Sequence, residues 1–189
     1  MSLEVDFVKS VKDAFGDSSE DTARRAAFQT IFNILNRPHH ENTSYEAVLE
    51  LLKDNVASLP LFVRVEQFGQ LLLHAALANV ASLEVVRLLV EADETRRTLL
   101  RPSTTREHMI ALHQALSQKR VSPRVIEFLM DADVSRKSWV TRHEARTSGR
   151  YPLHWAAAQG LTDVCRQLMD ENGEVAFASD NLKRLPLHY

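Results

Sequence analysis

Apolar residues recur at helical spacing over much of this chain. In the stretch 151–173, YPLHWAAAQGLTDVCRQLMDENG, Leu153, Ala156 and Ala157 fall on one face of a short helix. The pattern breaks at Gly160 and then resumes over 161–172 with Val164, Cys165, Leu168 and Met169. Because two helices of about ten residues each cannot bury such faces alone, the pattern predicts that they pack against neighbours.

The same unit recurs elsewhere in the chain. A leucine precedes a histidine at the start of four apolar stretches, and successive histidines are 39, 41 and 34 residues apart. The four pairs are Leu73-His74, Leu112-His113, Leu153-His154 and Leu187-His188. The three complete copies continue with an alanine two residues later and then a second apolar helix. The second helices are SLEVVRLLVEAD (82–93), SPRVIEFLMDAD (122–133) and LTDVCRQLMDEN (161–172). A period of this size is typical of stacked helical repeats.

These segments resemble ankyrin repeats, which begin Thr-Pro-Leu-His and continue with Ala-Ala and a Val-Val-x-Leu-Leu second helix. The resemblance covers roughly residues 70–189. It implies an all-α fold, an ankyrin-like solenoid of stacked helix-turn-helix repeats in which the last repeat is truncated. It also implies a noncatalytic protein-protein interaction module, a scaffold or adaptor.

The chain departs from the ankyrin pattern in three ways. The first-position threonine, a helix-capping residue, is replaced by Leu71, Ile110, Tyr151 and Leu185. The glycine after the second helix survives only as Gly173. The connections 94–108 and 134–150 are longer than the short hairpins of the family, so a regular β-turn is not expected there.

The prolines and histidines of the repeat can be explained by physical arguments that do not depend on the family. A proline in the first helical turn loses no hydrogen bond, which suits Pro152 and Pro186. The repeated histidines have two ring nitrogens that can link backbone groups of adjacent repeats. We therefore expect His74, His113 and His154 to be structural rather than metal ligands.

The region before residue 70 is predicted to be helical and irregular. Residues Leu3–Phe15 place apolar side chains on one face, and a second helix is expected from Asp21 to Asn36. Thr43 and Glu46 form a capping box before a third segment, 45–55. We interpret residues 1–69 as an N-terminal region with a cap and one diverged repeat (about 23–57), followed by the repeats of 70–189.

The sequence ends at Leu187-His188-Tyr189, where another repeat would begin. An array cut at that point leaves an apolar face uncovered. We therefore expect a fragment, a truncated gene product, or dependence on a partner, with self-association through the C-terminal end as one outcome.

Composition limits the partner and the compartment. The chain has 189 residues, 44% hydrophobic and 25% charged, with a formal net charge of −2 and a pI near 6.4. That charge gives no overall attraction to nucleic acid or to anionic lipid. The N-terminus lacks a secretory signal, no apolar run is long enough to span a membrane, and the single cysteine, Cys165, excludes an intrachain disulfide. We expect a cytoplasmic or nuclear protein in which Cys165 is a small apolar residue of a helix face.

No catalytic, cofactor-binding or metal-binding pattern is found in the sequence. It contains no glycine-rich phosphate loop and no GxSxG motif. The segment HEAR (143–146) lacks the second histidine of the zinc-protease motif, and His39-His40-Glu41 is most simply an exposed turn.

One local feature suggests a binding surface. The two long connections are rich in arginine and contain one tryptophan, Trp139. If the repeats stack, both connections project from one edge and form a basic rim suited to an acidic protein segment. The family resemblance adds the ends of the first helices, where positions four and five after each histidine face the groove. The predicted contact residues are Asn79, Gln118, Gln159, Trp139, Arg97, Arg101, Arg142 and Arg150.

Two alternatives to this interpretation stay open. The arginines of the connections could simply be solvated and paired with neighbouring acids. The chain could also be an accessory interaction region of a larger enzyme or signalling protein, such as a kinase or ubiquitin ligase. A nucleic-acid partner is not expected, because only Trp139 offers an aromatic ring for base stacking.

Overall fold

The computed structural model describes residues 71–79, 81–103, 108–142 and 148–189, and a few isolated residues before them. The isolated residues are Thr22, Ala26, Thr30, Ile31, Asn33 and Lys53. All regular structure in this described part is helical and none of it is strand, which confirms the all-α prediction. The chain forms two compact units, residues 1–98 and residues 99–189. The predicted division between residues 69 and 70 stays a prediction.

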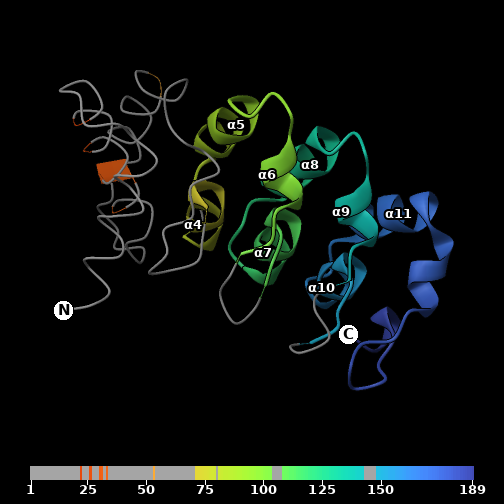
Figure 1. The fold of residues 1–189 in the computed structure, drawn as a ribbon. Coiled ribbons are helices and arrows are strands. Elements are labelled where there is room, and N and C mark those ends of the chain that lie inside the picture. Colours follow the sequence, from red (N-terminus) through yellow and green to blue (C-terminus); the bar gives the residue numbers. More distant parts are fainter. Residues whose placement is uncertain are drawn as a thin grey trace. The chain divides into compact units, whose positions relative to one another are not determined.

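In the first unit, helix α4 (Leu72–Ala78) packs against helix α5 (Leu83–Glu91), as Figure 1 shows. The Ser82 hydroxyl caps α5 by accepting a hydrogen bond from the Val85 N–H at 3.5 Å. The six isolated residues are helical, as predicted for 21–36 and 45–55. The predicted helix Leu3–Phe15, the capping box at Thr43 and the rest of the proposed first repeat lie outside the described residues.

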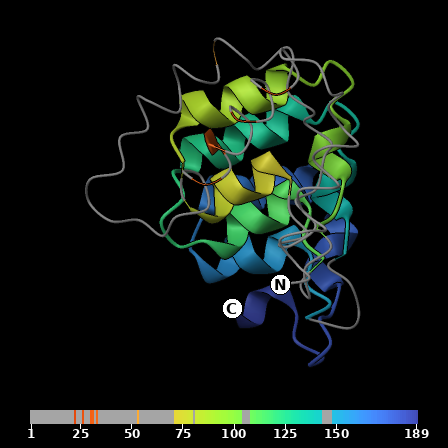
Figure 2. The ribbon, with the colours of Figure 1, turned by 60° about the vertical axis from the view of Figure 1, so that its left-hand side comes forward.

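The second unit contains two helix pairs. Helix α7 (Ala111–Ser117) packs against α8 (Pro123–Ala132), and α10 (Pro152–Ala158) packs against α11 (Thr162–Glu171). The first helices α7 and α10 also pack against each other, and they lie side by side in both ribbon views (Figures 1 and 2). The predicted second helices therefore agree with α5, α8 and α11 to within one or two residues at each end.

The chain after α11 continues in two short 3₁₀ helices, η2 (Gly173–Phe177) and η3 (Pro186–His188). Pro152 and Pro186 stand in the first turns of α10 and η3, as predicted. The first-helix N-cap residues make no side-chain capping bond, in agreement with the loss of the family's threonine.

The long connections contain an element that the sequence analysis did not anticipate, which we call the aspartate turn (residues 93–98 and 133–138). The Asp93 carboxylate accepts hydrogen bonds from the Thr95 hydroxyl at 2.7 Å and from the Thr98 N–H at 2.8 Å. The Asp133 carboxylate accepts from the Ser135 hydroxyl at 2.6 Å and from the Ser138 N–H at 2.8 Å. Each turn leads into a four-residue helix, α6 (Arg97–Leu100) or α9 (Lys137–Val140).

The fourth residue of each aspartate turn has a left-handed backbone. Arg96 and Arg136 both have φ of 54°, and the N–H of each donates to the carbonyl of the turn's aspartate. A third version stands at Asp180, whose carbonyl accepts from the N–H of Lys183, with φ of 62°. This backbone fixes where the side chain at that position leaves the turn.

Two glycines are required by backbone geometry. Gly160, with φ of 69°, turns the chain between α10 and α11. Gly149 has φ of 65°, and a Cβ atom there would lie 2.2 Å from the Asn181 Oδ1 atom and 2.7 Å from an Arg142 nitrogen. A side chain at residue 149 would therefore displace the ends of the Asn181 and Arg142 side chains, in addition to the strain of the positive φ.

Candidate functional site

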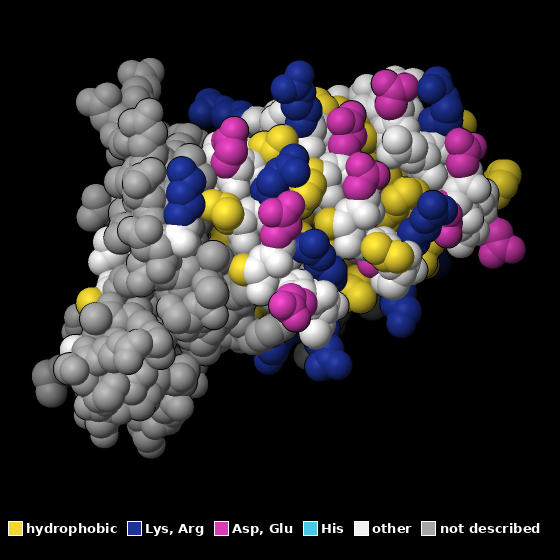
Figure 3. Space-filling view, turned by 90° about the horizontal axis from the view of Figure 1, so that it is seen from above, with side chains coloured by type: hydrophobic (Ala, Val, Ile, Leu, Met, Phe, Trp, Pro, Cys, Tyr) yellow, Lys and Arg dark blue, Asp and Glu magenta, His cyan; other side chains and the backbone are white. Residues whose placement is uncertain are grey.

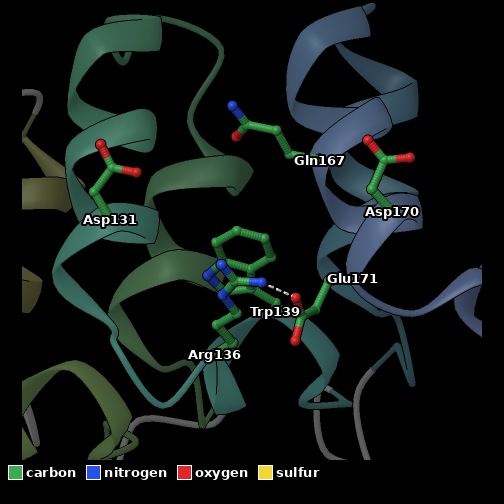
Figure 4. Close-up of a pocket in the computed structure, with 6 residues that line it drawn as sticks. All are labelled: Asp131, Arg136, Trp139, Gln167, Asp170 and Glu171. Carbon is green, nitrogen blue, oxygen red and sulfur yellow. Dashed lines mark hydrogen bonds and ion pairs between the residues drawn. The ribbon is translucent and has the colours of Figure 1, made fainter.

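The second unit has a polar cleft with a volume of about 340 Å³, which we call the Trp139 cleft (Figure 4). Asp131 of α8 lines one side, and three residues of α11 line the opposite side. Arg136 and Trp139, at the start of α9, lie between the two sides. The α11 residues are Gln167, Asp170 and Glu171.

The aspartate turn at 133–138 positions the centre of this cleft. Asp133 is buried and holds Ser135 and Ser138, so α9 starts at a fixed place. The left-handed backbone at Arg136 then places its guanidinium 5.1 Å from the centre of the Trp139 ring, within range of a cation–π contact. The same guanidinium forms an ion pair with the Glu171 carboxylate (Figure 4).

Trp139 is buried beneath this pair. Its side chain is 8% exposed, and its Nε1 atom has no hydrogen-bond acceptor within the described part of the chain. A buried indole N–H normally has a hydrogen-bond partner. The Trp139 N–H is therefore an exception among the described residues.

Histidines link successive segments of the second unit. His154 Nδ1 accepts a hydrogen bond from the Tyr151 N–H at 3.1 Å, and its Nε2 lies 3.2 Å from the Arg184 carbonyl oxygen. His113 Nε2 lies 2.9 Å from the Thr141 carbonyl oxygen. His154 thus joins the start of α10 to the segment that precedes η3, which is the backbone-linking role that the sequence suggested.

A polar network holds the last ten residues of the chain. The Tyr189 hydroxyl donates to the Asp180 carboxylate at 2.7 Å, and Arg184 pairs with the same carboxylate at 2.9 Å. The guanidinium carbons of Arg150 and Arg184 each lie 4.6 Å from the centre of the Tyr189 ring. Burial by itself raises the pKa of Asp180, but the hydrogen bonds from Tyr189 and Arg184 outweigh it and lower the pKa well below its ordinary value.

An apolar groove of about 350 Å³, which we call the C-terminal groove, lies between α10, α11 and the two 3₁₀ helices. It is lined by Leu153, Ala157, Cys165, Met169, Ala176, Phe177, Leu185, Pro186 and Leu187. Phe177 is 80% exposed and Leu187 is 89% exposed. Burial raises the pKa of the Cys165 thiol, which suits an apolar role for this residue rather than a reactive thiolate.

Two of the three predicted contact residues at the helix ends, Asn79 and Gln159, make internal side-chain contacts. Asn79, Gln118 and Gln159 are half-buried C-cap residues of α4, α7 and α10. The Asn79 amide donates to the Ala75 carbonyl at 3.2 Å, and the Gln159 amide donates to the Leu116 carbonyl of α7. Within the second unit, Gln118 and Gln159 thus stand at the same end of two packed helices.

The residues predicted for the basic rim have diverse environments. Trp139 is buried rather than projecting, because α9 directs it between α8 and α11. Arg142 donates to the Gly149 carbonyl and to the Asn181 side chain, and Arg150 stacks on Tyr189. Arg97 and Arg101 are exposed and form no ion pair with another described residue. Figure 3 shows basic and acidic side chains interspersed on the described part of the face that it presents.

Sequence reasoning missed Asp131, Asp170 and Glu171 as members of a cleft, because acids on second helices usually form a solvated face. It also missed the aspartate turn. A signal for that turn was present, since DETRRT (93–98) and DVSRKS (133–138) share the pattern Asp-x-Ser/Thr-Arg-x-Ser/Thr.

In the described ranges, no group of three or more His, Cys, Asp or Glu side chains could hold a metal ion. HEAR (143–146) and His39-His40-Glu41 lie outside those ranges. None of the helices in the described part is both long and apolar enough to cross a membrane.

One comparison with known protein families gives a match. Residues 148–181 match the ankyrin repeat model. This ankyrin repeat includes α10, α11 and η2 and reaches Asp180, and its histidine is His154. A search of curated proteins finds no match to the chain. The resemblance seen in the sequence is thus confirmed for this repeat, and for residues 70–147 and 182–189 it stays a prediction.

Proposed function

We propose that this chain is a noncatalytic protein-interaction module, a scaffold or adaptor, built as an ankyrin-like solenoid of stacked helix pairs. The ankyrin repeat at 148–181 supports this proposal, because repeats of this kind generally bind other proteins. The packing of α7 against both α8 and α10 is the arrangement expected of two successive repeats.

The observation that carries the proposal is the repeated histidine link. His154 and His113 each connect a first helix to a backbone carbonyl about 30 residues further along the chain, at separations of 30 and 28 residues. Both imidazoles are buried, at 0% and 1% exposure, and they lie in different helices. They therefore act as structural connectors between layers, which leaves the surface for binding.

Arg97 and Arg101 are the best candidates for contact with an acidic partner segment, because neither is committed to an ion pair with a described residue. Exposed charges of this kind favour association and orient a partner, and their effect weakens as salt screens them.

The proposal is tested by immobilising the chain, capturing proteins from a native lysate and measuring enrichment by mass spectrometry. We expect at least one protein to be enriched reproducibly and its capture to fall about tenfold with the double variant Arg97→Glu and Arg101→Glu. The matched control is Arg124→Glu with Arg166→Glu, which makes the same charge change on α8 and α11. Absence of any enriched protein, or equal loss with both variants, would contradict the proposal.

A further inference from the structure

The Trp139 cleft already holds one guanidinium. Arg136 stacks over the Trp139 ring at 5.1 Å and pairs with Glu171, so an aromatic face and a carboxylate act on the same cation. A planar guanidinium suits this arrangement because it can stack on a ring while its edge donates hydrogen bonds. The side chain of Arg136 is 55% exposed, so a competing cation from solvent can reach the pair.

The lining of the cleft has more negative charge than Arg136 can balance. Asp131 and Asp170 stand on opposite sides, and neither forms an ion pair or hydrogen bond with another described residue (Figure 4). The cleft therefore combines three carboxylates with one guanidinium.

A second observation independent of this charge is the buried Trp139 Nε1 atom, which lacks an acceptor although its side chain lines the cleft. An N–H donor needs an oxygen, and a metal ion or a simple amine does not supply one. A peptide supplies both a cationic side chain and carbonyl oxygens.

The dimensions of the cleft favour an extended cation over a metal ion. The carboxylates of the described residues do not gather closely enough to ligate a metal. A guanidinium spreads five N–H donors over a plane and can therefore interact with carboxylates that stand apart. The volume of about 340 Å³ leaves room for a side chain with part of its backbone.

We propose that the Trp139 cleft binds an arginine side chain of a partner protein segment. The partner's guanidinium replaces Arg136 over the indole and on Glu171, with Asp131 and Asp170 on either side of it. A carbonyl oxygen of the segment accepts the hydrogen bond that the Trp139 Nε1–H lacks. This inference rests on the proposed function, because it names the chemistry of one partner contact.

The probe for this proposal is the blocked peptide acetyl-Gly-Ser-Arg-Ser-Gly-amide at low ionic strength. A matched peptide with citrulline, which is neutral but similar in shape, is the control, and a lysine peptide tests the need for a planar cation. The chain contains two tryptophans, so a ¹⁵N-labelled sample gives two indole N–H signals, and Trp139→Phe identifies the one from Trp139.

We expect the arginine peptide to shift the Trp139 indole signal saturably, and the citrulline and lysine peptides to bind at least fivefold more weakly. Asp170→Asn and Glu171→Gln should each weaken arginine binding about fivefold or more. Asp163→Asn, on the same helix but outside the cleft, should leave it unchanged. Arg136→Gly removes the internal competitor and suits the left-handed backbone, so it should tighten binding several-fold.

Equal binding of the citrulline peptide, or saturation without movement of the Trp139 signal, would overturn the cleft proposal. Equal weakening by Asp163→Asn and Asp170→Asn would do the same, since it would show general charge attraction. Unchanged thermal melting of each variant confirms that it is folded. If the arginine peptide does not bind but proteins are still captured from the lysate, only the arginine-binding role of the cleft is rejected. If the peptide binds but no protein is captured, the proposed module function is rejected.

Discussion

His154 shows how one residue can join two separate segments of the second unit. Its side chain is fully buried, and its Nδ1 accepts from the Tyr151 N–H, so the proton must be on Nε2, where it is donated to the Arg184 carbonyl. Burial lowers the pKa of His154 below its ordinary value of 6.5, and the bond to Arg184 and the charge of Asp180 offset this only in part. The neutral imidazole is therefore the form that the fold requires.

This requirement makes stability depend on pH. Below pH 6.5 the unfolded chain binds a proton at this histidine more readily than the folded chain does, so the free energy of unfolding decreases as the pH falls. We expect His154→Gln to lower the free energy of unfolding at pH 7.5 by about 1–3 kcal/mol. The difference in the free energy of unfolding between the variant and the natural chain should be smaller at pH 5.5, because only the natural chain loses stability through protonation of His154. Urea unfolding at the two pH values checks this, and a constant difference would contradict it.

At the residue scale, the sequence predicts where the repeated residues stand better than it predicts which side chains they contact. The positions of the Leu-His pairs and of the prolines at helix starts could be predicted, because each depends on the local sequence. The burial of Trp139 could not be predicted from the sequence, because it follows from the direction of α9 and from packing between α8 and α11. The internal hydrogen bond of Gln159 likewise depends on the neighbouring helix α7.

At the scale of elements, the aspartate turns explain the path of the backbone at the start of each long connection, where residues 93–98 and 133–138 are described. Asp133 is 4% exposed and accepts three hydrogen bonds from Ser135 and Ser138, which fix the start of α9. The paired helices were predictable from apolar periodicity, whereas α6 and α9 have four residues each and are too short to show a period.

The aspartate turn gives a paired test. Asp133→Ala removes the acceptors of these bonds and leaves buried donors without a partner, so we expect it to lower the free energy of unfolding by about 2 kcal/mol or more. Asp131→Ala, two residues away and exposed, should change it by less than about 0.5 kcal/mol. Urea denaturation followed by tryptophan fluorescence measures both. Similar losses from the two variants would show that the turn does not depend on the carboxylate.

At the scale of the whole molecule, the described surface has mixed charge and includes an apolar groove. The exposed large apolar residues of the second unit include Met169, Phe177 and Leu187, which all line the C-terminal groove. Apolar patches of this kind favour association. An uncovered apolar face near the C-terminus was expected from the sequence, but which residues form the groove depends on η2 and η3.

We expect the chain to self-associate weakly through the C-terminal groove. Light scattering at increasing concentration should show a rising average mass, and the double variant Phe177→Glu and Leu187→Glu should reduce the association constant at least tenfold. Val134→Glu is the matched control, because Val134 is 89% exposed and lies outside the groove. A constant monomer mass for the natural chain, or an equal effect of the control, would contradict this expectation.

The contact at Gly149 has a consequence for how this protein can vary among species. The Arg142 guanidinium and the Asn181 amide occupy the space where a side chain at residue 149 would lie. A substitution at residue 149 would push the ends of both side chains away and disturb the hydrogen bond between them. These three positions should accordingly be inherited as a set, and relatives that lose the glycine should also have lost the asparagine.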